Sequence, residues 1–200
     1  MMRYLISLLL ATAACLADTG CVGTRPAHYY TLGTGAPAAT QSKPDGLILL
    51  VGNISTSEAL QDSRIRYRTG ANEAGAYEYH RWTERPGSMV RNALIRGLRD
   101  SAKYRRVLES GSSVSGDYLL RGELEEFDEV DGASIRTKIS LHVELVELKT
   151  NQIVWDHMLE RAEPVSGKTV VEVVQSLDRN LQQVVSETAS EIDRFLTSGR

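Results

Sequence analysis

A long one-sided apolar stripe near the C-terminal end most constrains how this 200-residue chain folds. Apolar or small side chains recur there at helical spacing, and Glu, Gln, Ser, Asp and Arg fill the positions between them. The spacing predicts one continuous helix over residues 168–196. Its stripe consists of Val170, Val174, Leu177, Leu181, Val184, Thr188, Ile192 and Phe195. A helix with one apolar stripe must bury that stripe against another layer, so the rest of the chain has to supply the layer.

The second half of the chain carries the sequence pattern of a sheet. From Ile135 onward, apolar residues alternate with polar ones, which predicts a strand with one face in water. Residues 150–152 predict a turn, and residues 153–161 predict the hairpin partner of that strand. Residues 117–127 predict a further strand, in which Phe127 falls out of phase and indicates a bulge.

Shorter elements are predicted in the first half. The continuous apolar run Leu47–Val51 is typical of a strand buried on both faces. Residues 88–102 predict an amphipathic helix with Ser88 as its N-cap. Three further short strands are predicted, at residues 63–69, 77–82 and 104–108. Together these patterns predict an α+β fold: a mostly antiparallel mixed sheet with two helices packed on one face.

The N-terminus has the layout of a secretory signal peptide. Arg3 precedes an uncharged run from Tyr4 to Ala17, which is shorter than the roughly 20 residues that a membrane-spanning helix needs. The pattern therefore predicts a cleaved signal over residues 1–14, or over residues 1–20 if the second cysteine marks the mature start.

Two cysteines are candidates for lipid attachment. The residues Thr12-Ala13-Ala14-Cys15 resemble a bacterial lipobox, in which small residues precede a cysteine that is acylated. Cys21 fits the same chemistry less well, because the carboxylate of Asp18 stands where an apolar side chain is wanted. A Cys15–Cys21 disulfide is a minor alternative. We therefore predict Cys15 as the acylated residue and keep Cys21 as the alternative.

The chain is predicted to have three parts. The signal is followed by a lipidated tether over residues 15–46, and residues 47–200 form the folded domain. Within the tether, residues 33–46 are rich in Gly, Pro, Ala and Thr, which predicts a flexible segment. A short edge strand is predicted near residues 28–32.

No pattern of catalytic residues appears. The chain has no G-x-S-x-G elbow and no phosphate-binding loop, and the H-x-E match at His142–Glu144 lacks its cysteine partners. His142 and His157 are expected to be solvated cross-strand neighbours rather than metal ligands. A formal charge of −3 argues against a nucleic-acid binder. We therefore expect a protein that is not an enzyme and that uses no metal or cofactor.

Charge is unevenly distributed along the chain. Residues 64–106 have a net charge of +7, and residues 107–147 have a net charge of −7. The first interpretation is that the two segments pair within the sheet and neutralise each other. The second is a basic face that meets anionic lipid headgroups or an acidic partner. The acidic cluster over residues 123–131 is expected to lie on a solvated strand edge.

The order of these features resembles the ABC-type transport auxiliary lipoprotein family, the PqiC/YmbA-like proteins of Gram-negative envelopes. The likeness begins with the signal and cysteine, followed by Tyr29-Tyr30-Thr31-Leu32 and the strand Leu47–Ile54. It continues through Ile65–Arg68, Tyr79-His80 and Trp82, Pro86 with Met89, Leu94 and Leu98, the strand Asp117–Asp128, the hairpin and the C-terminal helix. It spans essentially the whole mature chain. The family's spacing places the acylated cysteine close before the Tyr-Tyr pair, which favours Cys21.

The resemblance implies a lipid-anchored subunit on the periplasmic face of the envelope, at the outer membrane. Such a subunit works beside an ABC transporter permease and ATPase and a mammalian-cell-entry (MCE) domain protein, in systems that move lipids or other hydrophobic molecules between membranes. Assembly into a homo-oligomer is a further alternative. The alternative function is a stand-alone lipoprotein that binds a small hydrophobic ligand between helix and sheet. Because the polar face of the predicted C-terminal helix is rich in Glu and Gln, we expect acyl chains alone to hold the protein on the membrane.

Overall fold

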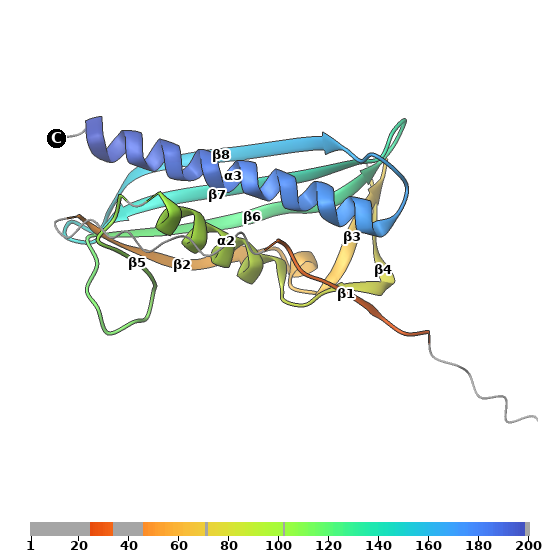
Figure 1. Ribbon diagram of the computed structural model, residues 1–200, viewed down its shortest axis with the longest axis horizontal. Helices are drawn as coiled ribbons and strands as arrows, with labels where there is room; N and C mark the ends of the chain where they lie inside the picture. The colour runs from red at the N-terminus through yellow and green to blue at the C-terminus, as the bar shows by residue number, and fades with distance from the viewer. Residues whose placement is uncertain (1–24, 34–45, 71, 102, 199–200) are drawn as a thin grey trace, which may run out of the picture.

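An open mixed sheet of eight strands forms the centre of the protein, with both α-helices on one of its faces (Figure 1). A computed structural model describes residues 25–33, 46–70, 72–101 and 103–198. Cys15, Cys21, the predicted signal peptide and most of the predicted tether lie outside these residues. The α+β architecture predicted from the sequence is confirmed.

The long strand β6 is the centre of the sheet. On one side it pairs with β2 along its first half and with β3 along its second half, and on the other side it pairs with β7. The strands are β1 (His28–Tyr30), β2 (Ile48–Thr56), β3 (Arg64–Thr69), β4 (Glu73–Trp82), β5 (Arg106–Glu109), β6 (Tyr118–Asp131), β7 (Arg136–Glu147) and β8 (Gln152–Pro164). The helices are the short 3-10 helix η1 (Glu58–Leu60), α2 (Pro86–Asp100) and α3 (Val170–Ser198).

Parallel and antiparallel pairings both occur. The two longest, β6–β7 and β7–β8, are antiparallel, as is β3–β4. The pairs β1–β4, β2–β5, β2–β6 and β3–β6 are parallel. On the side of β6 that carries both β2 and β3, the described sheet continues from β2 to the edge strand β5 and from β3 through β4 to the edge strand β1. On the other side of β6 it ends at β8.

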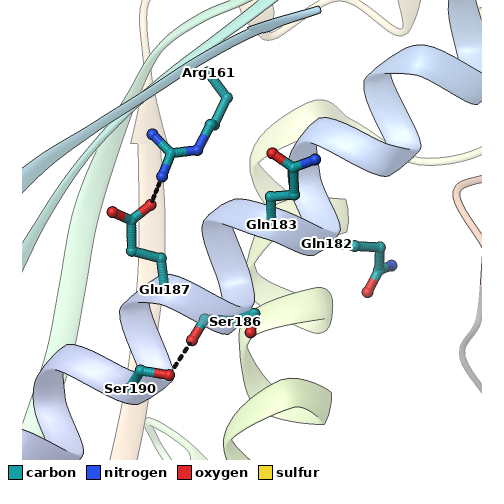
Figure 2. Close-up of a pocket in the computed structure, with 6 residues that line it drawn as sticks. All are labelled: Arg161, Gln182, Gln183, Ser186, Glu187 and Ser190. Carbon is teal, nitrogen blue, oxygen red and sulfur yellow. Dashed lines mark hydrogen bonds and ion pairs between the residues drawn. The ribbon is translucent and has the colours of Figure 1, made fainter.

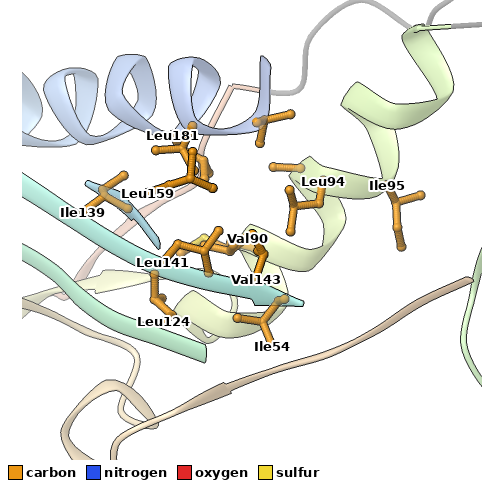
Figure 3. Packing of buried hydrophobic residues seen from close by; sticks show 14 of the residues in the cluster. Ile54, Val90, Leu94, Ile95, Leu124, Ile139, Leu141, Val143, Leu159 and Leu181 are labelled. Atoms are coloured by element: carbon orange, nitrogen blue, oxygen red, sulfur yellow. The ribbon is translucent and has the colours of Figure 1, made fainter. Parts of the chain in front are cut away.

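Helix α3 is one continuous helix, and its stripe is buried as the spacing predicts. Leu177, Leu181, Val184 and Ile192 have no exposed surface. The helix packs on β7 and β8 and against α2, while α2 packs on β2. Figure 3 shows Leu181 of α3 beside Leu159 of β8, over the apolar side chains of β7. The sheet thus supplies the apolar layer that a one-sided helix of this length needs.

A polar contact crosses this core. Ser176 Oγ of α3 lies 2.7 Å from Thr137 Oγ1 of β7, and Asn180 Nδ2 donates to the same hydroxyl at 2.9 Å. All three residues are buried. Because buried polar groups are costly unless they are hydrogen-bonded, these bonds favour one position of α3 along the sheet.

Several details differ from the predictions. Strand β4 begins at Glu73, before the predicted residue 77, and β6 continues to Asp131, beyond the predicted residue 127. Helix α2 begins at Pro86, with Arg85 and not Ser88 in the N-cap position, because proline suits the first turn, where no N–H partner is needed. Strand β5 begins at Arg106, later than predicted, and Tyr104 instead donates to Asp193 of α3. Strand β2 is buried on the helix side alone, since Leu50 is only half-buried. The acidic strand β6 lies in the middle of the sheet and not at an edge.

The predicted bulge in β6 is confirmed. The register with β7 shifts between Leu124 and Glu126. This extra residue returns Phe127 to the buried helix side of the sheet.

Candidate functional site

The N-terminal segment enters the fold through residues 28–33, which we call the docking segment. Both candidate lipid-attachment residues, Cys15 and Cys21, precede it in the chain and lie outside the described residues. The structure therefore leaves the choice between them open, and what it describes is the point where the predicted tether joins the domain. In Figure 1 this segment lies at the β1–β4 end of the sheet.

Three kinds of contact hold the docking segment. Strand β1 pairs in parallel with β4, in the register His28↔His80 to Tyr30↔Trp82. Leu32 is 4% exposed and belongs to the hydrophobic core. The backbone N–H of Gly33 donates to Asp178 Oδ1 of α3 at 3.1 Å. Backbone pairing, a buried side chain and a hydrogen bond to α3 thus join this segment to both layers of the domain.

Aromatic and imidazole rings pack around β1. The His28 and His80 rings are stacked with their centroids 5.1 Å apart, and Tyr77 meets His80 edge-on at 5.6 Å. The Tyr30 hydroxyl lies 2.8 Å from His80 Nδ1. Burial, together with the neighbouring His28 ring, lowers the pKa of His80 below its usual 6.5. The docked arrangement therefore favours the neutral His80 ring.

A buried carboxyl group extends this cluster into β6. The Tyr77 hydroxyl donates to Glu129 Oε2 at 2.8 Å. Burial raises the pKa of Glu129, and the hydrogen bond from Tyr77 opposes that rise. Burial and the contact with Glu129 likewise raise the pKa of Tyr77. No sequence pattern predicts this cluster, because only the β1–β4 and β3–β6 pairings bring these distant residues together.

The oppositely charged segments pair with each other. Buried Asp128 accepts from Arg66 Nε at 3.1 Å and from Arg68 Nε at 2.7 Å. Arg91 of α2 pairs with Glu109 of β5 at 2.7 Å. These contacts join the basic and acidic parts of the sequence, so the structure favours mutual neutralisation over a separate basic face.

The expectation that His142 and His157 are cross-strand neighbours is wrong. In the β7–β8 register, His142 lies opposite Met158, and His157 lies opposite Val143. This offset of one residue places the two imidazoles on opposite faces of the sheet. His157 Nε2 lies 3.6 Å from Glu191 of α3, whereas His142 Nε2 lies 3.7 Å from Asp156 on the face without helices.

A shallow polar pocket lies between β8 and the outer side of α3 (Figure 2). Its volume is about 470 Å³, and its lining consists of Arg161, Gln182, Gln183, Ser186, Glu187 and Ser190. Arg161 forms an ion pair with Glu187, and the Ser190 hydroxyl donates to the Ser186 carbonyl at 2.9 Å. The Arg161–Glu187 pair attaches β8 to α3, whereas the bond between the two serines lies within α3.

The described part of the chain holds no cluster of three or more His, Cys, Asp or Glu side chains that could bind a metal ion. None of its helices is both long enough and apolar enough to span a membrane.

Comparison with known proteins gives the family. The family model described as the ABC-type transport auxiliary lipoprotein component matches residues 30–189. A DUF330 protein from Xanthomonas campestris has a crystal structure similar to this one, with a TM-score of 0.77 at 19% identity, covering 86% of this chain and 98% of that chain. A second, uncharacterised protein has a TM-score of 0.67 at 16% identity, covering 84% of this chain and 99% of that chain.

Because the two proteins of known structure are only 19% and 16% identical to this chain, their similarity shows only a common fold. The match to the family model is what shows membership of the family. No curated protein matches in sequence. The matched residues extend from Tyr30 in the docking segment to Ala189 near the end of α3. The chain belongs to the family of ABC-type transport auxiliary lipoprotein components.

Proposed function

We propose that this protein is a non-enzymatic, lipid-anchored subunit on the periplasmic face of the cell envelope, held in the outer membrane. It works with an ABC transporter permease and ATPase and an MCE-domain protein, and the system moves lipids or other hydrophobic molecules between membranes. Membership of the transport auxiliary family supports this role.

The docking segment is the observation that carries the proposal. It joins the chain that follows the predicted lipobox to β4 and α3 through backbone pairing, buried Leu32 and the Gly33–Asp178 hydrogen bond. Cys15 precedes His28 by 13 positions, and an extended chain of that length spans at most about 45 Å. An acyl chain on Cys15 would thus keep the domain within that distance of the bilayer, where it can meet membrane-bound partners.

Co-purification tests the proposal. The full-length lipidated protein, carrying a C-terminal affinity tag, is solubilised from membranes in mild detergent, and its partners are identified by mass spectrometry. We expect the MCE-domain protein together with the permease and ATPase. An unrelated tagged outer-membrane lipoprotein serves as the control.

One outcome of the co-purification would contradict the proposal. If the protein carries co-extracted lipid but none of the three partners, it acts as a stand-alone lipoprotein that binds a hydrophobic ligand. The assignment to an ABC/MCE system is then wrong.

A further inference from the structure

On the face of the sheet that carries no helix, one aliphatic residue from each of five strands lies in a single row. We call these residues the aliphatic row. Its cross-strand pairs are Leu108↔Leu50, Leu50↔Leu119, Leu119↔Val146 and Val146↔Ile153. Neighbouring strands lie about 4.8 Å apart, so the row is about 19 Å long. It runs from β5 at one edge of the sheet to β8 at the other.

Strand alternation places the row opposite the helices. Val107, Leu49 and Leu145, each next in sequence to a member of the row, belong to the core beneath α2 and α3. Successive side chains on a strand point to opposite faces, so the row faces away from that core. None of its five residues belongs to the core cluster. Ile153 is 49% exposed, and Leu50, Leu108 and Leu119 are half-buried. Val146, which lies between Leu119 and Ile153, is 4% exposed.

A hollow of about 590 Å³ adjoins the row near the start of β2 and β6. Its apolar wall includes Leu47, Leu50, Tyr118 and Leu148. Gly116 borders it, and a Cβ atom there would lie 2.5 Å from Leu50 Cγ. The absence of a side chain at this position therefore lets the 110–117 loop pass close to Leu50 without filling the hollow.

Carboxylates lie beyond the row on the same face. The nearest charged pair is balanced, because Arg121 Nε contacts Glu144 Oε2 at 2.7 Å. Asp156 lies opposite Glu144 in the register, and its side chain is 69% exposed. Glu160 lies further along β8, opposite Ser140, and its side chain is 60% exposed. The closest basic groups are the His142 imidazole, whose Nε2 lies 3.7 Å from Asp156, and the Lys138 ammonium group, which lies 3.8 Å from Glu160.

The surface beside the β6–β8 part of the row is therefore negative, whereas Arg106 is exposed on the same face at the β5 end. Lys138 Nζ contacts two carboxylates. It lies 2.5 Å from Glu126 and 3.8 Å from Glu160, so it pairs mainly with Glu126. Glu123 is also exposed on this face, opposite His142 in the register. An apolar strip with a charged border resembles the core and rim of a protein interface.

We propose that this helix-free face binds a basic amphipathic segment of a partner protein. Apolar side chains of the segment cover the aliphatic row, and one of them enters the adjoining hollow. Its Lys and Arg side chains lie opposite Glu123, Asp156 and Glu160. The proposal goes beyond the transport role and does not depend on which transport system the protein serves.

The charge of this face decides which occupant it suits. A second copy that pairs through the same face would bring its own carboxylates close to these, and like charges across an interface oppose association. Anionic lipid headgroups would be repelled for the same reason. A basic polypeptide segment matches both the apolar and the charged part of the surface.

Site-specific photocrosslinking in the native bacterium tests this inference on the full lipidated chain. Benzoylphenylalanine replaces Leu119 or Ile153 in the row, and Val171 in a matched control. Val171 is a similarly exposed aliphatic residue, 50% exposed, on α3. We expect adducts from positions 119 and 153 that map by mass spectrometry to one partner segment with apolar residues and Lys or Arg, and no such adduct from position 171.

A charge exchange tests the electrostatic part. With the photoreactive residue at position 153, the double change Glu123→Lys/Asp156→Lys should lower the adduct yield about tenfold, because the rim then repels a basic segment. The matched change Glu58→Lys/Glu73→Lys, at exposed residues of η1 and β4, should leave the yield unchanged. Thermal melting confirms that each variant folds.

Several results would overturn the inference. They are adducts with lipid or with a second copy of this chain, an acidic partner segment, equal yields for the two charge exchanges, and no adduct at either row position. Each can occur whether or not the MCE-domain protein co-purifies, so failure here is distinguishable from failure of the proposed function.

Discussion

Cys15 is the residue on which membrane attachment depends in the proposed function. Its small neighbours Thr12, Ala13 and Ala14 fit lipobox chemistry, whereas Cys21 has the carboxylate of Asp18 nearby, which is costly to desolvate. We predict that Cys15→Ser abolishes metabolic labelling with palmitate in a Gram-negative host and that Cys21→Ser does not. The reverse result would place the mature start at Cys21, and an unlabelled wild type would contradict lipid anchoring altogether.

The pKa of His80 predicts a pH dependence of the docking segment. Burial and the His28 ring hold this pKa below 6.5, so protonation favours the undocked state. The stabilisation by neutral His80 is present above pH 6.5 and is lost as the pH falls through the lowered value. Tyr30, His28 and Tyr77 are the groups that contact this ring.

Hydrogen exchange measures this dependence. The Thr83 N–H donates to the Tyr30 carbonyl at 2.8 Å, and its protection, corrected for intrinsic exchange, should fall between pH 7.5 and pH 5. His80→Gln keeps a group that can bond to Tyr30 but has no imidazole, so its protection should be nearly constant. Equal pH dependence in both proteins would show that His80 is not the titrating group.

At the scale of elements, the stability of the domain depends on how α3 packs on the sheet. Leu181 has no exposed surface, and Gln182 beside it faces the shallow polar pocket. Leu181→Asp should cost about 3–5 kcal/mol of the 5–15 kcal/mol that holds a typical domain folded, because it leaves an unpaired charge buried. We expect the melting temperature to fall by about 10 °C or more, while Gln182→Asp changes it little. Equal melting of the two variants would mean that the stripe is not buried.

The sequence predicted which segments are helices and strands better than it predicted which strands pair with each other. Apolar and polar residues alternate around Ile139, and this spacing places all the apolar ones on one face only if the segment is a strand. The apolar residues around Leu181 lie on one face only if that segment is a helix. The pairing of β1 with β4, or of β3 with β6, leaves no local pattern. The error about His142 and His157 has the same origin, since a register shift of one residue reverses the face of every side chain.

At the scale of the whole molecule, the described surface does not favour direct membrane binding. The apolar stripe of α3 is buried in the core, and Arg66 and Arg68 form ion pairs with Asp128 and Glu126. A shortened protein that begins at Arg25 should therefore stay off liposomes of neutral or anionic lipid in a flotation assay, whereas the lipidated chain binds both. Strong binding of the shortened protein to neutral liposomes would contradict attachment through acyl chains alone.

The sequence by itself determined the α+β class, the long helix, the hairpin and the bulge before Phe127, because each follows from the spacing of side chains along a single element. The tertiary structure alone decided which strands meet. Parallel pairing of distant strands brought His28 beside His80, placed the acidic strand β6 in the middle of the sheet, and set Leu50 beside Leu119. Such contacts depend on the register between strands far apart in the chain, and that register is selected by how the whole core packs.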